Sequence, residues 1–109
     1  AAEVDALLTE DGGGAFGEFL SDVAAHGTQV FVLGYPDPPV GGNDFSGCVA
    51  DLRVLATRLD AMEGVTLVPS HRAIASEDMS YYDPDRVHPS IKASSLMAEL
   101  LAAAIKASP

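Results

Sequence analysis

The fold of this chain is decided by residues 29–35, which read Gln-Val-Phe-Val-Leu-Gly-Tyr. This run is rich in Val, Phe and Leu and lacks polar alternation, which is typical of a strand covered on both faces in a parallel sheet. Residues 65–69, Val-Thr-Leu-Val-Pro, have the same character. The two runs therefore predict two parallel strands.

The segment between these runs predicts a crossover helix over residues 47–63. Its apolar side chains recur at spacings of four and three, at Cys48, Leu52, Leu55, Leu59 and Met62. A strand, helix and strand in this order form a right-handed unit. Because Cys48 lies on the apolar stripe, we expect a buried small hydrophobe and not a nucleophile. It is the only cysteine, so an internal disulfide is excluded.

Two further helices are expected on either side of this unit. From residue 15 the apolar side chains share one helical face, at Phe16, Phe19, Leu20, Val23 and Ala24. After Ser90 a second face predicts a final helix that docks on the sheet, with Met97, Leu100, Leu101, Ala104 and Ile105. Residues 1–14 have no clear period beyond a short helical turn. The chain is thus predicted to be α/β, with about two strands and three helices.

Composition excludes several classes of function. The 109 residues include 6 basic and 16 acidic side chains, and the net charge of −10 repels nucleic acid and anionic membrane surfaces. The longest apolar runs are too short to cross a bilayer, so we expect no transmembrane segment. The chain begins at Ala1 without Met. We therefore expect a processed product or one piece of a cut polypeptide, with a secreted or periplasmic location favoured over a cytoplasmic one.

The stretch that carries chemistry is residues 81–90, Tyr-Tyr-Asp-Pro-Asp-Arg-Val-His-Pro-Ser. Asp85 and His88 stand three residues apart at the mouth of the final helix. A carboxylate that is hydrogen-bonded to one imidazole nitrogen fixes the tautomer, which leaves the other nitrogen free to take a proton from a nucleophile. The helix dipole disfavours imidazolium, so a nearby carboxylate is needed to keep His88 basic. Asp83 competes with Asp85 for this role.

Three tyrosines are candidates for substrate binding. Tyr81 and Tyr82 precede the acid and the histidine, and Tyr35 ends the first predicted strand. Loops at the carboxyl ends of parallel strands form the ligand crevice of open sheets, so we expect residues 36–46 to border the site. The alternative for Tyr81 and Tyr82 is that they pack the loop onto the body of the protein.

The pattern Asp-x-x-His-Pro, followed by an amphipathic helix and preceded by a strand that ends Val-Leu-Gly-Tyr-Pro, resembles the C-terminal half of an SGNH (GDSL-type) serine hydrolase. The resemblance covers roughly residues 15 to 107. It implies a flavodoxin-like three-layer αβα parallel sheet, of which residues 1–109 supply the C-terminal part of a single domain. It also implies that Asp85 and His88 are the acid and base of a Ser-His-Asp triad. Ala93 departs from the family, which commonly has Gly there.

Residues 41–44, Gly-Gly-Asn-Asp, are similar to the oxyanion motif of that family, Gly-x-Asn-Asp. In the family this motif precedes the Val-Leu-Gly-Tyr-Pro strand by a whole helix, whereas here it follows the strand. The alternative is that these four residues are an ordinary turn, for which Gly and Asn are the usual residues.

One catalytic group of the family is missing from this sequence. The family carries its nucleophilic serine in a Gly-Asp-Ser motif, which this sequence lacks. Two strands alone also leave sheet edges and apolar surface uncovered. We therefore expect a complementary N-terminal half, a separate chain or a cleaved segment, that carries the serine. The expected function is a serine ester hydrolase, an acyl or acetyl esterase or a lipase-like enzyme.

Its substrate would be a small-molecule, lipid or sugar ester, and the mechanism requires no metal or organic cofactor. The alternative is a non-catalytic SGNH-like interaction module, in which Asp85 and His88 are relics. A third possibility is an unrelated flavodoxin-like binding fragment.

Overall fold

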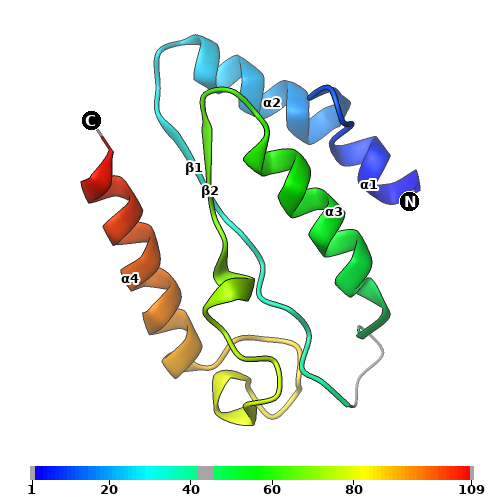
Figure 1. Cartoon of the computed structure of the whole chain (residues 1–109), viewed down its shortest axis with the longest axis vertical. Coiled ribbons are helices and arrows are strands. Elements are labelled where there is room, and N and C mark those ends of the chain that lie inside the picture. Colours follow the sequence, from blue (N-terminus) through cyan, green and yellow to red (C-terminus); the bar gives the residue numbers. More distant parts are fainter. Residues whose placement is uncertain (1, 42–45, 109) are drawn as a thin grey trace. The chain divides into compact units, whose positions relative to one another are not determined.

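A computed structural model describes residues 2–41 and 46–108, and Figure 1 shows the course of the chain. The described part is α/β, as predicted. Its elements follow in the order α1 (Ala2–Leu7), α2 (Gly14–Ala25), β1 (Val30–Leu33), η1 (Ser46–Cys48), α3 (Val49–Asp60), β2 (Val65–Val68), η2 (Ser70–Arg72), η3 (Met79–Tyr81) and α4 (Ile91–Ala107), where η marks a 3-10 helix.

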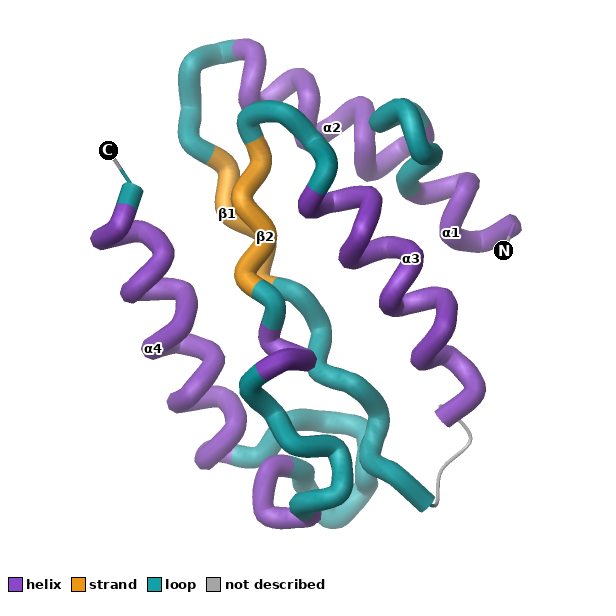
Figure 2. The backbone as a smooth tube through the Cα atoms, in the orientation of Figure 1, coloured by secondary structure: helices purple, strands orange, loops and turns teal. Residues whose placement is uncertain are grey.

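The strands β1 and β2 are neighbours in a two-stranded parallel sheet (Figure 2). Both strand predictions are thereby confirmed, although each strand has four residues. The backbone N–H of Gly34 donates to the carbonyl of Val68 at 2.8 Å, so contact between the two segments continues just past β1. Pro36 and Pro69 follow, and a proline has no N–H to donate to a ladder.

By their internal contacts the residues divide into two compact units. The first runs from the N-terminus to Val32 and from Asp51 to Leu67. The second runs from Leu33 to Ala50 and from Val68 to the C-terminus. Each unit has a hydrophobic cluster of its own. The acid and histidine singled out in the sequence both belong to the second unit.

The core of the first unit is built from α2, α3, β2 and the residue that follows α1. Its buried members are Leu8, Leu20, Leu59 and Val65. The predicted stripe on α3 is confirmed at Leu55 and Leu59, but the face predicted for α2 was wrong at Phe19, which is 62% exposed. Gly17 and Leu20 mark the buried side of α2. At about 100° per residue, Phe19 points roughly 200° away from Gly17.

The N-terminal segment, which lacks a clear period, packs closely on α2. Leu8 is fully buried, and the guanidinium of Arg58 donates to its carbonyl at 2.8 Å and to the carboxylate of Asp5 at 2.6 Å. A Cβ at Gly17 would lie 2.3 Å from the carbonyl oxygen of Gly12. This close approach of two backbones explains why glycine stands inside α2.

The core of the second unit surrounds Tyr82, with Ile74 and Ala93 as its other buried members. The hydroxyl of Tyr82 donates to the carbonyl of Asp37 at 2.6 Å, which satisfies its polar end inside the protein. Ala93 has no exposed surface. A residue as small as alanine therefore fits the first turns of α4 where the helix meets this core.

Cys48 corrects one prediction, because its side chain is exposed and not buried. The helix expected over residues 47–63 is divided into the short η1 and the longer α3. Cys48 lies in the 3-10 turn before α3, whereas the apolar side chains that pack in the core, Leu55 and Leu59, belong to α3 itself.

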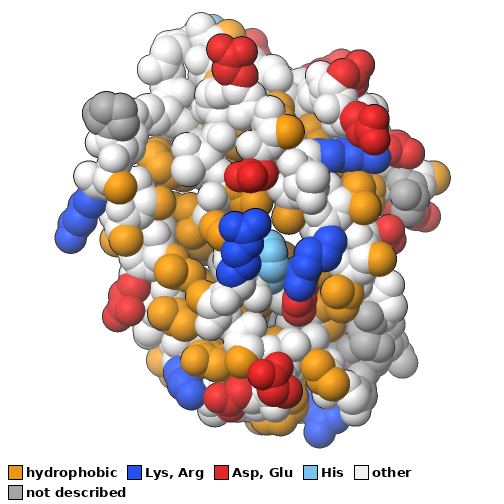
Figure 3. Space-filling model, in the orientation of Figure 1, with side chains coloured by type: hydrophobic (Ala, Val, Ile, Leu, Met, Phe, Trp, Pro, Cys, Tyr) orange, Lys and Arg blue, Asp and Glu red, His pale blue; other side chains and the backbone are white. Residues whose placement is uncertain are grey.

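Many apolar side chains reach the surface (Figure 3). The large ones that are exposed are Leu7, Phe19, Leu33, Tyr35, Val40, Val54, Met79, Ile91 and Ile105. Acidic side chains are scattered over the face shown in Figure 3. None of the helices in the described part of the chain has the length and apolar character needed to cross a membrane.

Candidate functional site

The acid and histidine lie in a loop over residues 81–90 that is closed at its base. The N–H of Ser90 donates to the carbonyl of Tyr81 at 2.8 Å, and the N–H of Asp83 donates to the carbonyl of His88 at 2.9 Å. Tyr82 and Pro89 form an antiparallel bridge between these two bonds. The loop is therefore built like a short hairpin, whose tip carries Asp85 and whose second leg carries His88.

The tip of the loop is organised by the carboxylate of Asp85. Its Oδ1 accepts the N–H groups of Val87 at 2.9 Å and of His88 at 3.1 Å. Arg86, which lies between Asp85 and Val87, has a φ of 58°, a left-handed conformation that residues other than Gly, Asn and Asp adopt rarely. The hydrogen bonds of Asp85 offset the cost of this turn and hold the backbone of His88.

The other carboxylate oxygen of Asp85 makes the contact that the sequence predicts. Oδ2 lies 2.5 Å from Nδ1 of His88. Because an ionised carboxylate can only accept, Nδ1 carries the proton, and in the neutral ring Nε2 has a free lone pair. The side chain of His88 is 69% exposed and that of Asp85 47% exposed. The structure thus places a tautomer-fixed histidine in contact with solvent.

The pair perturbs the pKa of both of its members. The hydrogen bond from His88, aided by the N–H groups of Val87 and His88, lowers the pKa of Asp85 to about 2. The same hydrogen bond raises the pKa of His88 above its ordinary value, and the negative charges of Asp85 and then Asp83 add to the effect. Asp83 therefore acts on His88 through its charge, while Asp85 makes the contact.

The helix expected after this loop begins where it was predicted. Ser90 is the N-cap of α4, and its Oγ accepts the N–H of Ala93 at 3.3 Å. The same hydroxyl donates to the carbonyl of Ser80 at 2.7 Å. One side chain thus caps the helix and joins it to the segment that leads into the loop.

The three tyrosines differ in their surroundings. Tyr82 is 7% exposed, and its hydroxyl donates to the carbonyl of Asp37. Its surroundings therefore agree with the alternative that it packs the loop onto the body of the protein. Tyr81 is half-buried, with the ammonium of Lys92 4.3 Å from the centroid of its ring. Tyr35 is 55% exposed. An open depression of about 270 Å³ adjoins the loop and is lined by Met79, Tyr82, Asp83, Pro84 and Arg86. Tyr35 and Tyr81 are not among these residues.

Within the described part of the chain, the ring of His88 is hydrogen-bonded to Asp85 and to no serine hydroxyl. The sequence has no Gly-Asp-Ser motif. The oxyanion interpretation of residues 41–44 falls largely on residues 42–45, which lie outside the described residues. Gly41 itself has a φ of 82°, as expected of glycine in a turn.

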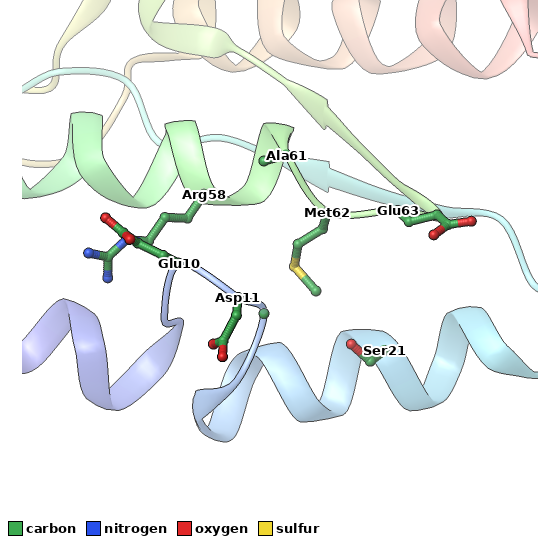
Figure 4. Close-up of a pocket in the computed structure, with 8 residues that line it drawn as sticks. Glu10, Asp11, Ser21, Arg58, Ala61, Met62 and Glu63 are labelled. Carbon is green, nitrogen blue, oxygen red and sulfur yellow. The ribbon is translucent and has the colours of Figure 1, made fainter.

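A second depression, in the first unit, was not found from the sequence. It has a volume of about 270 Å³, and its lining includes Glu10, Asp11, Ser21, Arg58, Ala61, Met62 and Glu63 (Figure 4). Arg58 is already paired with Asp5, and Asp11 accepts the hydroxyl of Thr9 at 2.5 Å. The loop between α1 and α2 is rich in glycine and acidic residues, as ordinary turns are. Its sequence therefore gives no sign that it borders a depression.

Acidic and histidine side chains are also the usual ligands of metal ions. Among residues 2–41 and 46–108, no three His, Cys, Asp or Glu side chains gather as ligands of a metal ion would. The acid and histidine at the loop are a pair, and Asp83 contributes charge from the other side of the turn.

Comparison with models of known protein families, with curated proteins and with solved structures finds no match for this chain.

Proposed function

We propose that this chain is the acid and base half of a serine ester hydrolase, with His88 as general base and Asp85 as the residue that orients it. The nucleophilic serine would come from a complementary segment, in a three-layer domain of the kind that the sequence resembles. The observation that carries the proposal is the contact between Oδ2 of Asp85 and Nδ1 of His88, which leaves Nε2 as a solvent-accessible proton acceptor.

The geometry supports a specific division of work between the two residues. Nε2 of His88 takes the proton of the serine hydroxyl as the serine oxygen attacks the ester carbonyl. The imidazolium then gives that proton to the leaving alcohol, and the serine is left acylated. Water repeats the sequence on the acyl-serine, which releases the acid and restores neutral His88. Asp85 stays ionised throughout, and its lowered pKa suits that role.

One feature of the surroundings supports a substrate with an apolar part, and another supports a second polypeptide. The depression beside the loop is lined by Met79, Tyr82 and Pro84 as well as by the charged Asp83 and Arg86. A short acyl chain next to a polar leaving group fits such a lining. The exposed apolar side chains are consistent with a second polypeptide that covers part of this surface.

The experiment is labelling with a fluorophosphonate, which reacts with activated serines. Material that contains this chain together with its complementary segment should be labelled, and peptide mapping should place the label on a serine outside these 109 residues. Intact mass of the same material would identify the second polypeptide. A label on Ser46 or Ser70 would overturn the division of the site between two segments.

The second candidate is a non-catalytic interaction module. It is favoured by the double role of Asp85, since Oδ1 already closes the turn through the N–H groups of Val87 and His88. Because the carboxylate stabilises the turn, Asp85 has a structural reason to be at this position even if the protein catalyses no reaction. Under this alternative, the assembled material would show neither labelling nor hydrolysis of short acyl esters, while binding to the partner would persist.

A further inference from the structure

Lys92 stands where a helix is least favourable to a cation. It is the second residue of α4, directly in the first turn after the N-cap Ser90. The positive end of the helix dipole disfavours a positive side chain there, and the first turn has no acidic residue to offset it. The contacts that Lys92 makes outside its helix must therefore stabilise its positive charge at this position.

Among the described residues, these contacts of Lys92 are with residues 78–81, the segment that leads into the loop of the acid and histidine. The ammonium of Lys92 donates to Oγ of Ser80 at 2.6 Å and lies 3.6 Å from Oδ2 of Asp78. It also lies 4.3 Å from the centroid of the Tyr81 ring. A cation that meets a hydroxyl, a carboxylate and an aromatic face at once is held in one place.

The residues that Lys92 contacts are themselves tied together. Oδ1 of Asp78 accepts the N–H of Ser80 at 2.9 Å and its hydroxyl at 2.7 Å, which caps η3. Lys92, Ser80 and Asp78 thus form a chain of hydrogen bonds with a charge at each end. The hydroxyl of Ser90 adds a second link, to the carbonyl of Ser80.

We propose that Lys92 is a positioning residue that clamps the base of the 81–90 loop, joining the segment that enters the loop to the helix that leaves it. The clamp is a property of the loop, and its meaning for catalysis rests on the function proposed above. Its consequence for His88 follows from the next bonds along the loop. When the base of the loop opens, the hydrogen bonds from Ser90 to Tyr81 and from Asp83 to His88 weaken. The backbone of His88 then keeps only its hydrogen bond to the carboxylate of Asp85.

The test compares Lys92→Met, which keeps most of the apolar stem and loses the ammonium, with Lys92→Arg, which keeps a cation of similar reach. Amide hydrogen exchange is followed by NMR in the 109-residue chain. We expect the amides of Ser90 and Asp83 to exchange about fivefold faster in Lys92→Met, as for the loss of one net hydrogen bond, and to be restored in Lys92→Arg. The amides of Ala73 and Ile74, which donate to Ser70 in the same unit, should not change.

A second readout separates a clamp from a simple charge effect. Loss of a positive charge alone cannot lower the pKa of His88, whereas a looser contact with Asp85 lowers it toward its ordinary value. Asp85 and Asp83 are the charged groups that act on this ring, and both stay in place in the variants. We expect the pKa of His88, measured by NMR, to fall in Lys92→Met and to recover in Lys92→Arg.

Several outcomes would overturn the clamp. One is unchanged exchange at Ser90 and Asp83 in Lys92→Met, and another is a rise in the pKa of His88 without faster exchange. A third is exchange of these two amides at the free-peptide rate in the unmutated chain, because the base would then not be closed. If instead the clamp behaves as expected and the assembled material hydrolyses no ester, the proposed function fails while the clamp stands. In an active complex, Lys92→Met should lower kcat more than it changes KM.

Discussion

Asp85 holds His88 twice, with Oδ1 on the backbone N–H and Oδ2 on Nδ1 of the ring, at 3.1 and 2.5 Å. One carboxylate thus fixes both the main chain and the tautomer of the same histidine. The arrangement is local, because the four residues 85–88 are enough to build it once Arg86 adopts its left-handed conformation. The loop itself therefore carries the geometry of the pair.

The first prediction concerns the identity of the orienting acid. Asp85→Asn keeps an oxygen for the backbone N–H groups but can no longer hold the ring in the productive tautomer, so we expect ester hydrolysis by the assembled enzyme to fall about 10⁴-fold. Asp83→Asn is the matched control, since Asp83 acts only through its charge. Steady-state kinetics of both variants would show the difference. A larger loss in Asp83→Asn would contradict the assignment.

The second prediction is the pH dependence of activity. Only the neutral ring of His88 can accept the serine proton, and the pKa of His88 is raised by Asp85 and Asp83. We therefore expect kcat/KM to increase with pH and to reach half of its plateau above about 6.5, the ordinary value for histidine. In Asp83→Asn this midpoint should move down. A midpoint below 6.5 in the unmutated enzyme would show that His88 is not the titrating base.

The same pKa shifts give the sign of the pH dependence of folding. The raised pKa of His88 contributes stability that is fully present below about 6.5 and is lost as pH rises through the folded value. The lowered pKa of Asp85 contributes stability that is present above 3.8 and is lost as pH falls toward about 2. The pair is thus most stabilising between these limits. Both side chains are exposed, so solvent screens the effect.

The third prediction concerns the packing of the N-terminal segment. Gly17→Ala should lower the free energy of unfolding strongly, by several kcal/mol, because the new Cβ would lie 2.3 Å from the carbonyl oxygen of Gly12. Gly47→Ala is the control, since a Cβ there meets nothing within 4 Å. Denaturant titration of both variants measures the difference. Equal stability of the two would show that residues 1–14 do not pack on α2 as described.

The fourth prediction concerns Ser70, whose hydroxyl is fully buried and has no hydrogen-bond partner among the described residues. A buried polar atom without a partner costs about 1 to 3 kcal/mol. Ser70→Ala should therefore raise the free energy of unfolding and leave hydrolysis unchanged. Thermal or denaturant unfolding checks the first point. A clear loss of stability would mean that the hydroxyl has a partner that stabilises the fold.

Sequence patterns predicted the elements of this chain better than their packing. The apolar runs at residues 29–35 and 65–69 and the stripe through Leu55 and Leu59 indicated a strand, helix and strand because periodicity depends on burial. The burial of Leu8 could not be predicted, since the other buried members of its hydrophobic cluster lie far from it in the sequence. Phe19 was misplaced because a wide apolar face leaves the direction of the core undetermined.

In the candidate site, too, a contact between neighbours in the sequence could be predicted, and contacts between distant segments could not. The contact between Asp85 and His88 could be predicted because it needs only a turn of fixed length. The burial of Tyr82 and its bond to Asp37 join segments far apart in the sequence, so the pattern left its role open between packing and substrate binding. Lys92 gave no signal, because a lysine near a helix start is unremarkable until its contacts with Ser80 and Tyr81 are seen.

The central claim is that His88 activates a serine supplied by another segment. The most direct measurement is the rate of fluorophosphonate labelling of the assembled material with unmutated chain and with His88→Ala, at equal partner occupancy. We expect His88→Ala to suppress labelling of that serine by at least about 10³-fold, with little change in the melting temperature. The exposed ring contributes to the reaction and little to the core. Labelling that proceeds at the same rate without the imidazole would contradict the account.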